Sequence, residues 1–359
     1  MKRSRVHIED YTVGWVCALP IELAAAQEML DEDHPDLQRD RNYTNLYTLG
    51  RIGEHNVVIA CLPAGQTGTN SAASVAVQMK SKFVSIQFGL MVGIGGGVPS
   101  VESELQLGDV VISQPDMQHG GVVQYDLGKT GVGGYFTRTG SLNTPPTVLL
   151  NALLKLQSNH HRGRSSISTY LSSICRLPKF SRNGAGSDIL FESTYDHIEG
   201  PTCDRCSRDR AVARAVRKVT VHYGTIASGN QVIKDGVTRD RISSELGGIL
   251  CFEMEAAGLM NSFPCLVARG ICDYADSHKN KRWQPYAAAT AAACAKELLS
   301  VIPSVEVAET STMRSSKDTT GAQMKNTSEN KGNFANQAGQ QITQGDVTIN
   351  QRVFQCSTY

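Results

Sequence analysis

Nearly continuous apolar runs alternate with helical patterns along most of this chain. The run Tyr11–Leu19 is typical of a strand buried on both faces, and Ile21–Leu30 after it has the composition of a helix. Val84–Val92 is another such strand, and Gln284–Val301 is an alanine-rich helix. Because strands that alternate with helices are typical of α/β proteins, the sequence predicts one α/β domain over residues 11–303.

Gly-rich and polar segments directly follow several of these strands. Gly93–Gly97 follows one strand, and Gly229–Asp235 follows the strand predicted at Val219–Ser228. Glycine lets a backbone approach a ligand closely, and ligands bind at the carboxyl ends of strands in α/β sheets. A dinucleotide fingerprint would need glycine where this chain has Val98, so a Rossmann site is excluded. We expect these segments to share one site.

A second group of polar residues lies further along the chain. Glu253 and Glu255 flank Met254 at the start of a predicted short helix, and Asp273 lies past the strand predicted at Cys265–Ala268. Carboxylates in such positions can hold the hydroxyls of a polyol and protonate a leaving group. The sequence therefore predicts a pocket with this chemistry.

Composition excludes several classes of protein. The chain of 359 residues carries a formal net charge of +1, which argues against attraction to nucleic acid or acidic membranes. No run approaches the roughly 20 apolar residues of a membrane span. The cysteines are scattered, mostly through apolar runs, as reduced thiols would be. These features predict a cytoplasmic protein without a membrane or nucleic-acid partner.

Both ends of the chain differ from the predicted domain. Residues 1–10 form a short N-terminal extension, and residues 304–359 form a tail rich in Ser, Thr, Asn and Gln. Such a tail buries too little apolar surface to offset the entropy lost on ordering, so we predict that it is disordered. Polar and apolar residues alternate in part of it, which also allows self-association as a β segment.

Residues 155–218 form a basic stretch inside the predicted domain. Three of its arginines lie close together in the sequence: Arg205, Arg208 and Arg210. They are either solvated or form a collar that attracts phosphate groups. Cys203 and Cys206 in the same stretch have the spacing of a CxxC motif. Without a second pair of ligands this motif is a weak signal for zinc, so the sequence predicts no metal site, and no cofactor is expected.

Six short segments together resemble the nucleoside phosphorylase/nucleosidase superfamily. In chain order they are Ala18–Glu22, Gly93–Gly97, Leu107–Val111, Ser228–Asn230, Phe252–Glu255 and Arg269–Asp273. The resemblance covers residues 11–303 and implies a three-layer αβα sandwich around a mixed, partly barrel-like sheet. It also implies a homo-oligomer, a dimer or higher, that binds a small purine nucleoside or nucleotide.

The resemblance implies a role for each segment. Met254 and Glu255 would bind the ribose, and Asp273 would protonate the purine as the glycosidic bond breaks. Contacts to the base are implied for the segment Gln231–Ile233, including Val232 and Ile233, and Phe252 either stacks on the base or belongs to the core. The Gly-rich segment contributes Gly93, Ile94, Gly95 and Gly96. Because glycosidic cleavage passes through an oxocarbenium-like state, carboxylates on both sides of the bond suit it.

The type of reaction depends on the residues near the nucleophile. Phosphorylases of this superfamily hold phosphate with two arginines and a Ser or Thr, and the corresponding places here hold Glu22, Met91 and Ile94. Because a carboxylate repels phosphate, hydrolysis is favoured. Resemblance to methylthioadenosine/S-adenosylhomocysteine nucleosidases implies that Glu22 activates water and that Arg269 lies near this water. Ile94 replaces a serine usual in those enzymes.

The basic stretch and the tail resemble the fungal branch of the superfamily, in which this domain often precedes signalling ATPases and repeat proteins. Some superfamily members in such defence settings hydrolyse purine nucleotides, including ATP. We therefore predict an N-glycosyl hydrolase (nucleosidase) acting on adenosine-type nucleosides or ATP. The alternatives are a phosphate-dependent phosphorylase, an inactive purine-binding sensor, and an interaction protein that acts through its tail.

Overall fold

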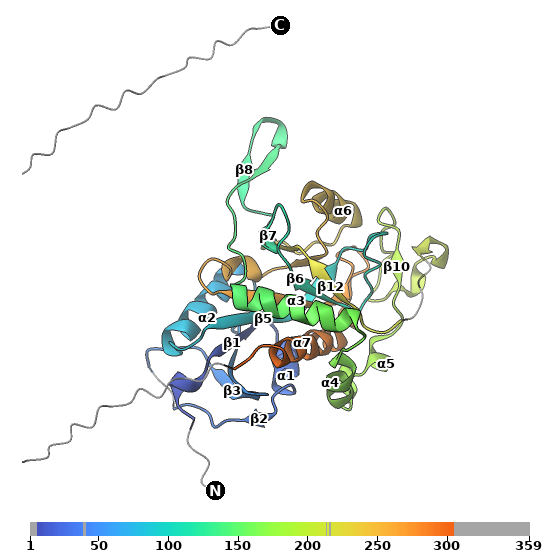
Figure 1. The fold of residues 1–359 in the computed structure, drawn as a ribbon. Helices are drawn as coiled ribbons and strands as arrows, with labels where there is room; N and C mark the ends of the chain where they lie inside the picture. Colours follow the sequence, from blue (N-terminus) through green and yellow to red (C-terminus); the bar gives the residue numbers. More distant parts are fainter. Residues whose placement is uncertain (1–5, 39–40, 213, 215–216, 305–359) are drawn as a thin grey trace, which may run out of the picture. The chain divides into compact units, whose positions relative to one another are not determined.

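Strands from the whole length of the domain pair into one mixed sheet of 11 strands (Figure 1). The computed structural model describes residues 6–38, 41–212, 214 and 217–304. The main path of the sheet runs through β12 (Val221–Gly224), β6 (Val110–Ser113), β15 (Cys265–Asp273), β5 (Phe88–Gly97), β1 (Val13–Cys17), β4 (His55–Cys61), β3 (Tyr47–Ile52) and β2 (Glu32–Asp33). Three further strands branch from it: β7 (Val122–Gln124), β13 (Ile226–Ser228) and β14 (Cys251–Glu253).

The two faces of this sheet bury different helices. Alternate side chains of a strand point to opposite faces, so Trp15 and Val16 of β1 belong to two separate core clusters. The first cluster includes residues of α1 (Pro20–Gln27), α3 (Thr147–His161), α4 (Ile167–Ile174) and α7 (Gln284–Ser300). The second cluster includes residues of α2 (Thr69–Lys82). The predicted three-layer αβα sandwich is confirmed (Figure 1).

The alanine-rich helix α7 packs directly on the central strands. Its small side chains let it lie close to β15, where a Cβ on Gly270 would collide with the carbonyl oxygen of Ala287. Helices α3 and α4 add to the same layer, and Leu156, Ile167 and Leu171 are buried there. Part of the basic stretch 155–218 therefore contributes to the core of the domain.

Strand β5 changes its neighbour along its length. Its first residues pair with β1 as far as Met91, whereas Gly96 and Gly97 pair with β14. On its other edge, β5 pairs with β15 along most of its length. The stretch of β5 around Ile94 is thus left without a strand on one side, because β1 ends at Cys17. This stretch is where side chains from other segments reach the strand.

Four details of the predicted secondary structure are wrong. Asp273 is the last residue of β15 and does not lie past the strand. The segment Gly93–Gly97 is the second half of β5 and not a loop, because the hydrogen-bond ladder with β15 holds these glycines extended. The strand predicted at Val219–Ser228 is divided into β12 and β13, which pair with different strands. Glu253 ends β14, and the 3-10 helix η6 begins only at Ala256 (Ala256–Gly258).

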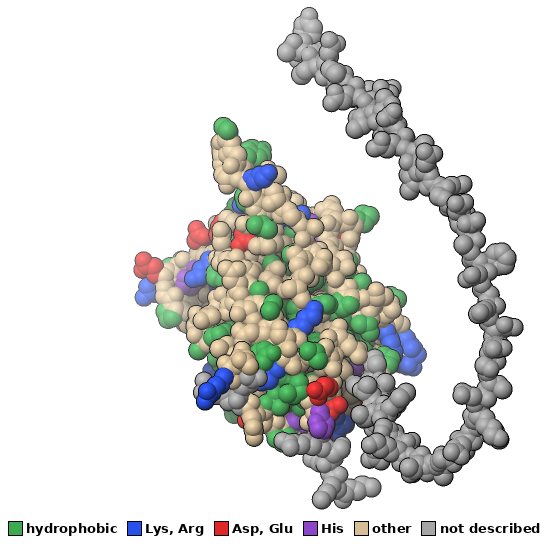
Figure 2. Space-filling model, turned by 90° about the vertical axis from the view of Figure 1, so that its left-hand side faces the viewer, with side chains coloured by type: hydrophobic (Ala, Val, Ile, Leu, Met, Phe, Trp, Pro, Cys, Tyr) green, Lys and Arg blue, Asp and Glu red, His purple; other side chains and the backbone are tan. Residues whose placement is uncertain are grey.

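Shorter elements complete the described chain. They are α5 (Arg182–Ala185), α6 (Gly236–Glu245), β8 (Gly128–Thr130), β9 (Phe136–Arg138), β10 (Leu190–Phe191), β11 (Ala211–Val212), and the 3-10 helices η1 (Ile8–Asp10), η2 (Val132–Gly134), η3 (Pro178–Phe180), η4 (Cys203–Arg205) and η5 (Arg208–Arg210). The predicted tail, 304–359, lies outside the described residues except for its first residue. No helix in the described ranges is both long and apolar enough to cross a membrane. On the face drawn in Figure 2, Lys and Arg side chains lie in small separate groups.

Candidate active site

A cavity of about 160 Å³, here called the first cavity, lies beside the part of β5 that β1 leaves uncovered. Its walls come from the turn after β1, from β5, from the segment after β13, from β14 and from the start of α7. Predicted site residues that line it are Glu22, Ile94, Gly95, Gly96, Val232, Ile233, Phe252, Met254 and Glu255. Segments that are far apart in the sequence therefore meet here.

Glu22 is held at the wall of this cavity by backbone groups. One carboxylate oxygen accepts hydrogen bonds from the N–H groups of Ala18 (2.7 Å) and Leu19 (2.9 Å), and the other accepts from Ile94 N–H (2.8 Å). Burial raises the pKa of Glu22, while the charge of Arg269 and these backbone donors act against the shift. A carboxylate has about four acceptor positions, so three donors leave room for one more, such as a water molecule.

Arg269 lies behind the cavity wall and is completely buried. Its Nη2 donates to Glu253 and lies 3.5 Å from a carboxylate oxygen of Glu255. Burial acts to lower the pKa of Arg269, but Glu253, Glu255 and Glu22 outweigh it, so the pKa is raised. A single guanidinium therefore contacts two carboxylates, those of Glu253 and Glu255, and its charge also acts on Glu22. A Cβ at Gly93 would collide with this guanidinium and with Glu22, which explains the need for glycine there.

Glu255 is the second carboxylate in contact with Arg269. Burial raises its pKa to about 7; Arg269 opposes the shift, and the charges of Glu253 and Glu22 add to it. Its other carboxylate oxygen accepts a hydrogen bond from Gly68 N–H (3.2 Å) at the start of α2. Near neutral pH the group can thus both accept from and donate to a hydroxyl of a ligand.

An apolar wall faces these carboxylates. Phe252 lies edge-on to Tyr125, with ring centroids 5.4 Å apart and an interplanar angle of 88°. The Tyr125 hydroxyl donates to the carbonyl of Gln231 (2.7 Å) and so ties down the segment that carries Val232 and Ile233. Phe252 belongs to a small apolar cluster and also lines the cavity, so its predicted place in the core is observed and stacking on a base stays a prediction.

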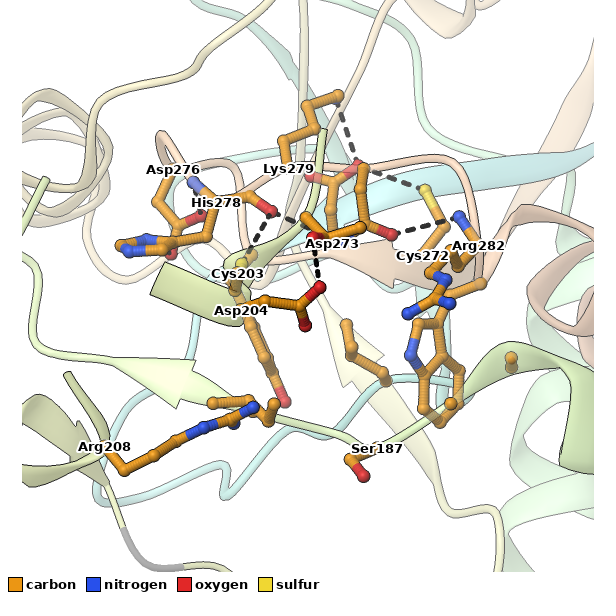
Figure 3. A pocket seen from close by; sticks show the side chains of 18 residues that line it. Ser187, Cys203, Asp204, Arg208, Cys272, Asp273, Asp276, His278, Lys279 and Arg282 are labelled. Atoms are coloured by element: carbon orange, nitrogen blue, oxygen red, sulfur yellow. Dashed lines mark hydrogen bonds and ion pairs between the residues drawn. The ribbon is translucent and has the colours of Figure 1, made fainter. Parts of the chain in front are cut away.

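Asp273 lines a second cavity of about 320 Å³ (Figure 3) and does not line the first. Its neighbours Cys272 and Lys279 line both cavities. One carboxylate oxygen accepts from Ala275 N–H (2.9 Å), and the other lies 3.1 Å from the Lys279 ammonium group. Ala275 has a φ of +51°, a left-handed conformation that costs roughly 1–2 kcal/mol. The turn thus fixes the direction of Asp273.

Two residues of this site were missed in the sequence. Glu253 was noted only as a flanking carboxylate, but it is the main partner of Arg269. Lys279 forms an ion pair with Asp273, and burial, which lowers its pKa, is outweighed by this carboxylate. Neither role follows from spacing, because both depend on how the chain turns after a strand.

The three arginines of the predicted collar do not converge. Arg208 lines the second cavity, as does Asp273. Arg210 forms an ion pair with Glu192, and Arg205 is exposed and lines neither cavity. A collar built from all three arginines is therefore not assembled in this structure.

The model of the phosphorylase superfamily matches residues 12–301. The chain belongs to this superfamily. Its assignment from six short segments is thereby confirmed. A nucleotide-binding leucine-rich repeat (NLR)-like protein of Hyaloscypha variabilis is 47% identical over 313 residues, which cover 84% of this chain but only 30% of that protein. The chain thus spans about a third of the length of this relative.

Two more relatives and one solved structure are informative. A 5'-methylthioadenosine/S-adenosylhomocysteine nucleosidase of Mycobacterium bovis is 26% identical over 81% of this chain and 97% of its own length. ATP nucleosidase Cap17 of Escherichia coli is 25% identical over 77% of this chain and 48% of its own length. The structure of futalosine hydrolase from Helicobacter pylori has a TM-score of 0.53 at 16% identity, over 81% of this chain and 98% of that chain. This last similarity concerns the fold alone.

Proposed function

We propose that this domain hydrolyses the N-glycosidic bond of an adenosine-type purine nucleoside or nucleotide and releases the free base. The wall around Glu22 supports the proposal most directly. A phosphorylase needs cations to bind phosphate, but this wall presents a buried carboxylate. Met91 is buried in the core, and Arg269 is already in contact with two carboxylates. The described residues of this wall therefore offer phosphate no unpaired cation.

In the proposed reaction, Glu22 takes a proton from water, and the water oxygen bonds to C1′ of the sugar. The bond between C1′ and the base breaks, and its electron pair goes to the base. Asp273 gives a proton to the base, and the Lys279 ammonium, 3.1 Å away, stabilises the carboxylate that remains. Met254 and Glu255 hold the ribose hydroxyls. The products are the free base and the free sugar.

The relatives support this choice of reaction and of substrate class. Two of them carry the names of a methylthioadenosine/S-adenosylhomocysteine nucleosidase and an ATP nucleosidase, and both names describe cleavage of adenine derivatives. The NLR-like relative, of which the matched region covers 30%, supports a setting in which the domain belongs to a larger protein, and a role in defence is part of our proposal. A cytoplasmic homo-oligomer is our proposal for the assembled state.

A product analysis with purified protein tests the reaction. Adenosine, inosine, methylthioadenosine and ATP are incubated with and without phosphate, and base and sugar products are separated by chromatography. We expect free adenine and a free sugar hydroxyl at C1′ whose oxygen comes from labelled water, at a rate independent of phosphate. Sugar 1-phosphate as the product would establish a phosphorylase instead. Purine binding without base release would establish a sensor.

Arg208 provides a test of how nucleotides bind. Because Asp273 contacts the base in the proposed reaction, Arg208 lies at the base end of the site, away from a 5′-triphosphate. We therefore expect Arg208→Ala to change kcat/KM for adenosine and for ATP by similar factors, with Arg210→Ala, which removes the ion pair with Glu192 and the contact with the Tyr195 ring, as the control. A selective loss of ATP cleavage, on the order of 10-fold or more for a lost contact to phosphate, would support the predicted collar.

A further inference from the structure

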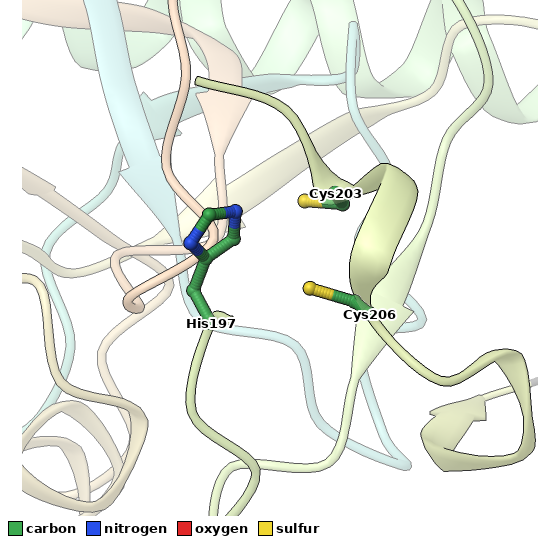
Figure 4. A group of neighbouring side chains, drawn as sticks. All are labelled: His197, Cys203 and Cys206. Carbon is green, nitrogen blue, oxygen red and sulfur yellow. The ribbon is translucent and has the colours of Figure 1, made fainter. Parts of the chain in front are cut away.

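Three potential metal ligands meet in the loop that follows β10. One nitrogen of His197 and the sulfur atoms of Cys203 and Cys206 all lie within 4.8 Å of one another (Figure 4). Ligand atoms around a tetrahedral zinc ion are roughly 3.5–4 Å apart, given Zn–S and Zn–N bonds of about 2.3 and 2.0–2.1 Å. Shifts of about 1 Å would therefore bring these three atoms into the geometry of a zinc site.

The local backbone presents the two cysteines together. Cys203 begins the 3-10 helix η4, and the N–H of Cys206 donates to the carbonyl of Cys203 (3.2 Å), which turns both sulfur atoms to the same side. The backbone N–H of His197 donates to the Ser277 hydroxyl (3.0 Å), and its Nε2 now contacts the Thr202 carbonyl (3.1 Å). A bond from this imidazole to a metal would replace that single neutral contact.

The candidate for a fourth ligand comes from a different part of the chain and lies outside the group of atoms within 4.8 Å of one another. His278 is buried, and neither of its ring nitrogens makes a hydrogen bond within the described residues. Its ring stacks on Phe191 at 4.1 Å and lies 5.5 Å from the ring of His197, centroid to centroid. Two imidazoles bound to one tetrahedral ion have centroids about 5 Å apart, given the Zn–N length. Nδ1 of His278 lies 3.8 Å from a carboxylate oxygen of Asp276, too far for a hydrogen bond. Because a buried polar group without a hydrogen bond is costly, a bond from the His278 ring to a metal would remove that cost.

We propose that His197, Cys203, Cys206 and His278 form a structural zinc site. The site would fasten the loop after β10 to the segment that follows β15. His278 precedes Lys279, which pairs with Asp273, so the same bonds would also fix the position of this lysine. Four protein ligands with no open position make the ion structural, and it takes no part in the reaction.

Measurement of bound metal tests the proposal on the full chain, purified without a histidine tag. We expect about one zinc ion per chain by elemental mass spectrometry, and less than about a tenth of that in Cys206→Ser and His197→Ala, since a structural site needs all its ligands. Cys175→Ser is the matched control: this half-buried cysteine donates to the Phe180 carbonyl, a bond that serine can replace. Removal of zinc by a chelator should lower the melting temperature by roughly 5–10 °C.

A second measurement does not depend on variants that fold. X-ray absorption of the wild-type zinc protein should give two sulfur and two nitrogen ligands, with Zn–S near 2.3 Å. A wild-type chain that binds no stoichiometric zinc when refolded with the ion would overturn the proposal. So would equal zinc content in the wild type, Cys206→Ser and His197→Ala, or a Cys203–Cys206 disulfide in freshly purified protein.

Discussion

Asp273→Asn should lower kcat for base release by roughly 100- to 10,000-fold, the range expected for loss of a general acid. Asparagine keeps the shape of the side chain and can still accept from Ala275 N–H, but it has no acidic proton for the departing base. It also leaves the Lys279 ammonium group without its carboxylate partner. Steady-state kinetics with the best substrate of the panel measures the effect, and circular dichroism checks the fold.

The neighbouring Asp276 supplies a matched control for this substitution. It is buried to a similar degree and also accepts a backbone hydrogen bond, from His278 N–H at 3.0 Å. We expect Asp276→Asn to change kcat by less than about 3-fold, because the Asp276 carboxylate contacts His278 and, unlike that of Asp273, makes no ion pair with Lys279. An equal loss in both variants would assign the effect to the stability of the loop and contradict the role of Asp273 as acid.

Glu22→Gln should reduce kcat by a similar factor, roughly 100- to 10,000-fold, because an amide cannot take a proton from water. Burial raises the pKa of Glu22, and a base works only when it is ionised. The wild-type rate should therefore fall as the pH is lowered through this raised pKa, at a higher pH than for an exposed glutamate. A pH–rate profile of the variant should have lost this limb.

The same substitution should also cost stability. Both carboxylate oxygens accept backbone N–H groups, so a glutamine must turn its NH2 group toward at least one donor, at a cost of about 1–3 kcal/mol. Chemical rescue separates the two effects: formate should restore base release in Glu22→Ala if a missing carboxylate is the cause. A variant that is less stable but cleaves at the wild-type rate would contradict the role of Glu22 as base. It would show that Glu22 only caps the N-terminus of α1.

The sequence predicted the family and the layers of the fold correctly because both rest on local patterns in chain order. It failed at Gly93–Gly97, where a run of glycines is typical of a turn. The structure needs them in an extended strand, since Gly93 makes room for Glu22 and Arg269. A glycine in the sequence thus indicates that other groups approach the backbone closely, but it does not show whether the glycine lies in a turn or in a strand.

Contacts between distant segments account for what the sequence could not predict. Charge density suggested that Arg205, Arg208 and Arg210 act together, but Glu192 has the spatial position to neutralise Arg210. Conversely, the roles of Glu253 and Lys279 appear only when β14 and the turn after β15 are placed beside Arg269 and Asp273. Sequence patterns locate candidate site residues, but only the folded structure shows which of their charges are neutralised by an ion pair.

The change of neighbour along β5 has a consequence for how a substrate enters and leaves. Glu22 is bound to Ile94, and β14, which carries Glu253, pairs with the end of the same strand, so both walls move with one rigid backbone. They cannot separate without breaking the central sheet. Substrate and product must therefore pass on the opposite side of the cavity, along the segment after β13. On that segment Val232 is 48% exposed, and the Tyr125 hydroxyl donates to the Gln231 carbonyl. We therefore expect movement of the segment that carries Val232, rather than opening of the sheet, to admit the substrate and release the base.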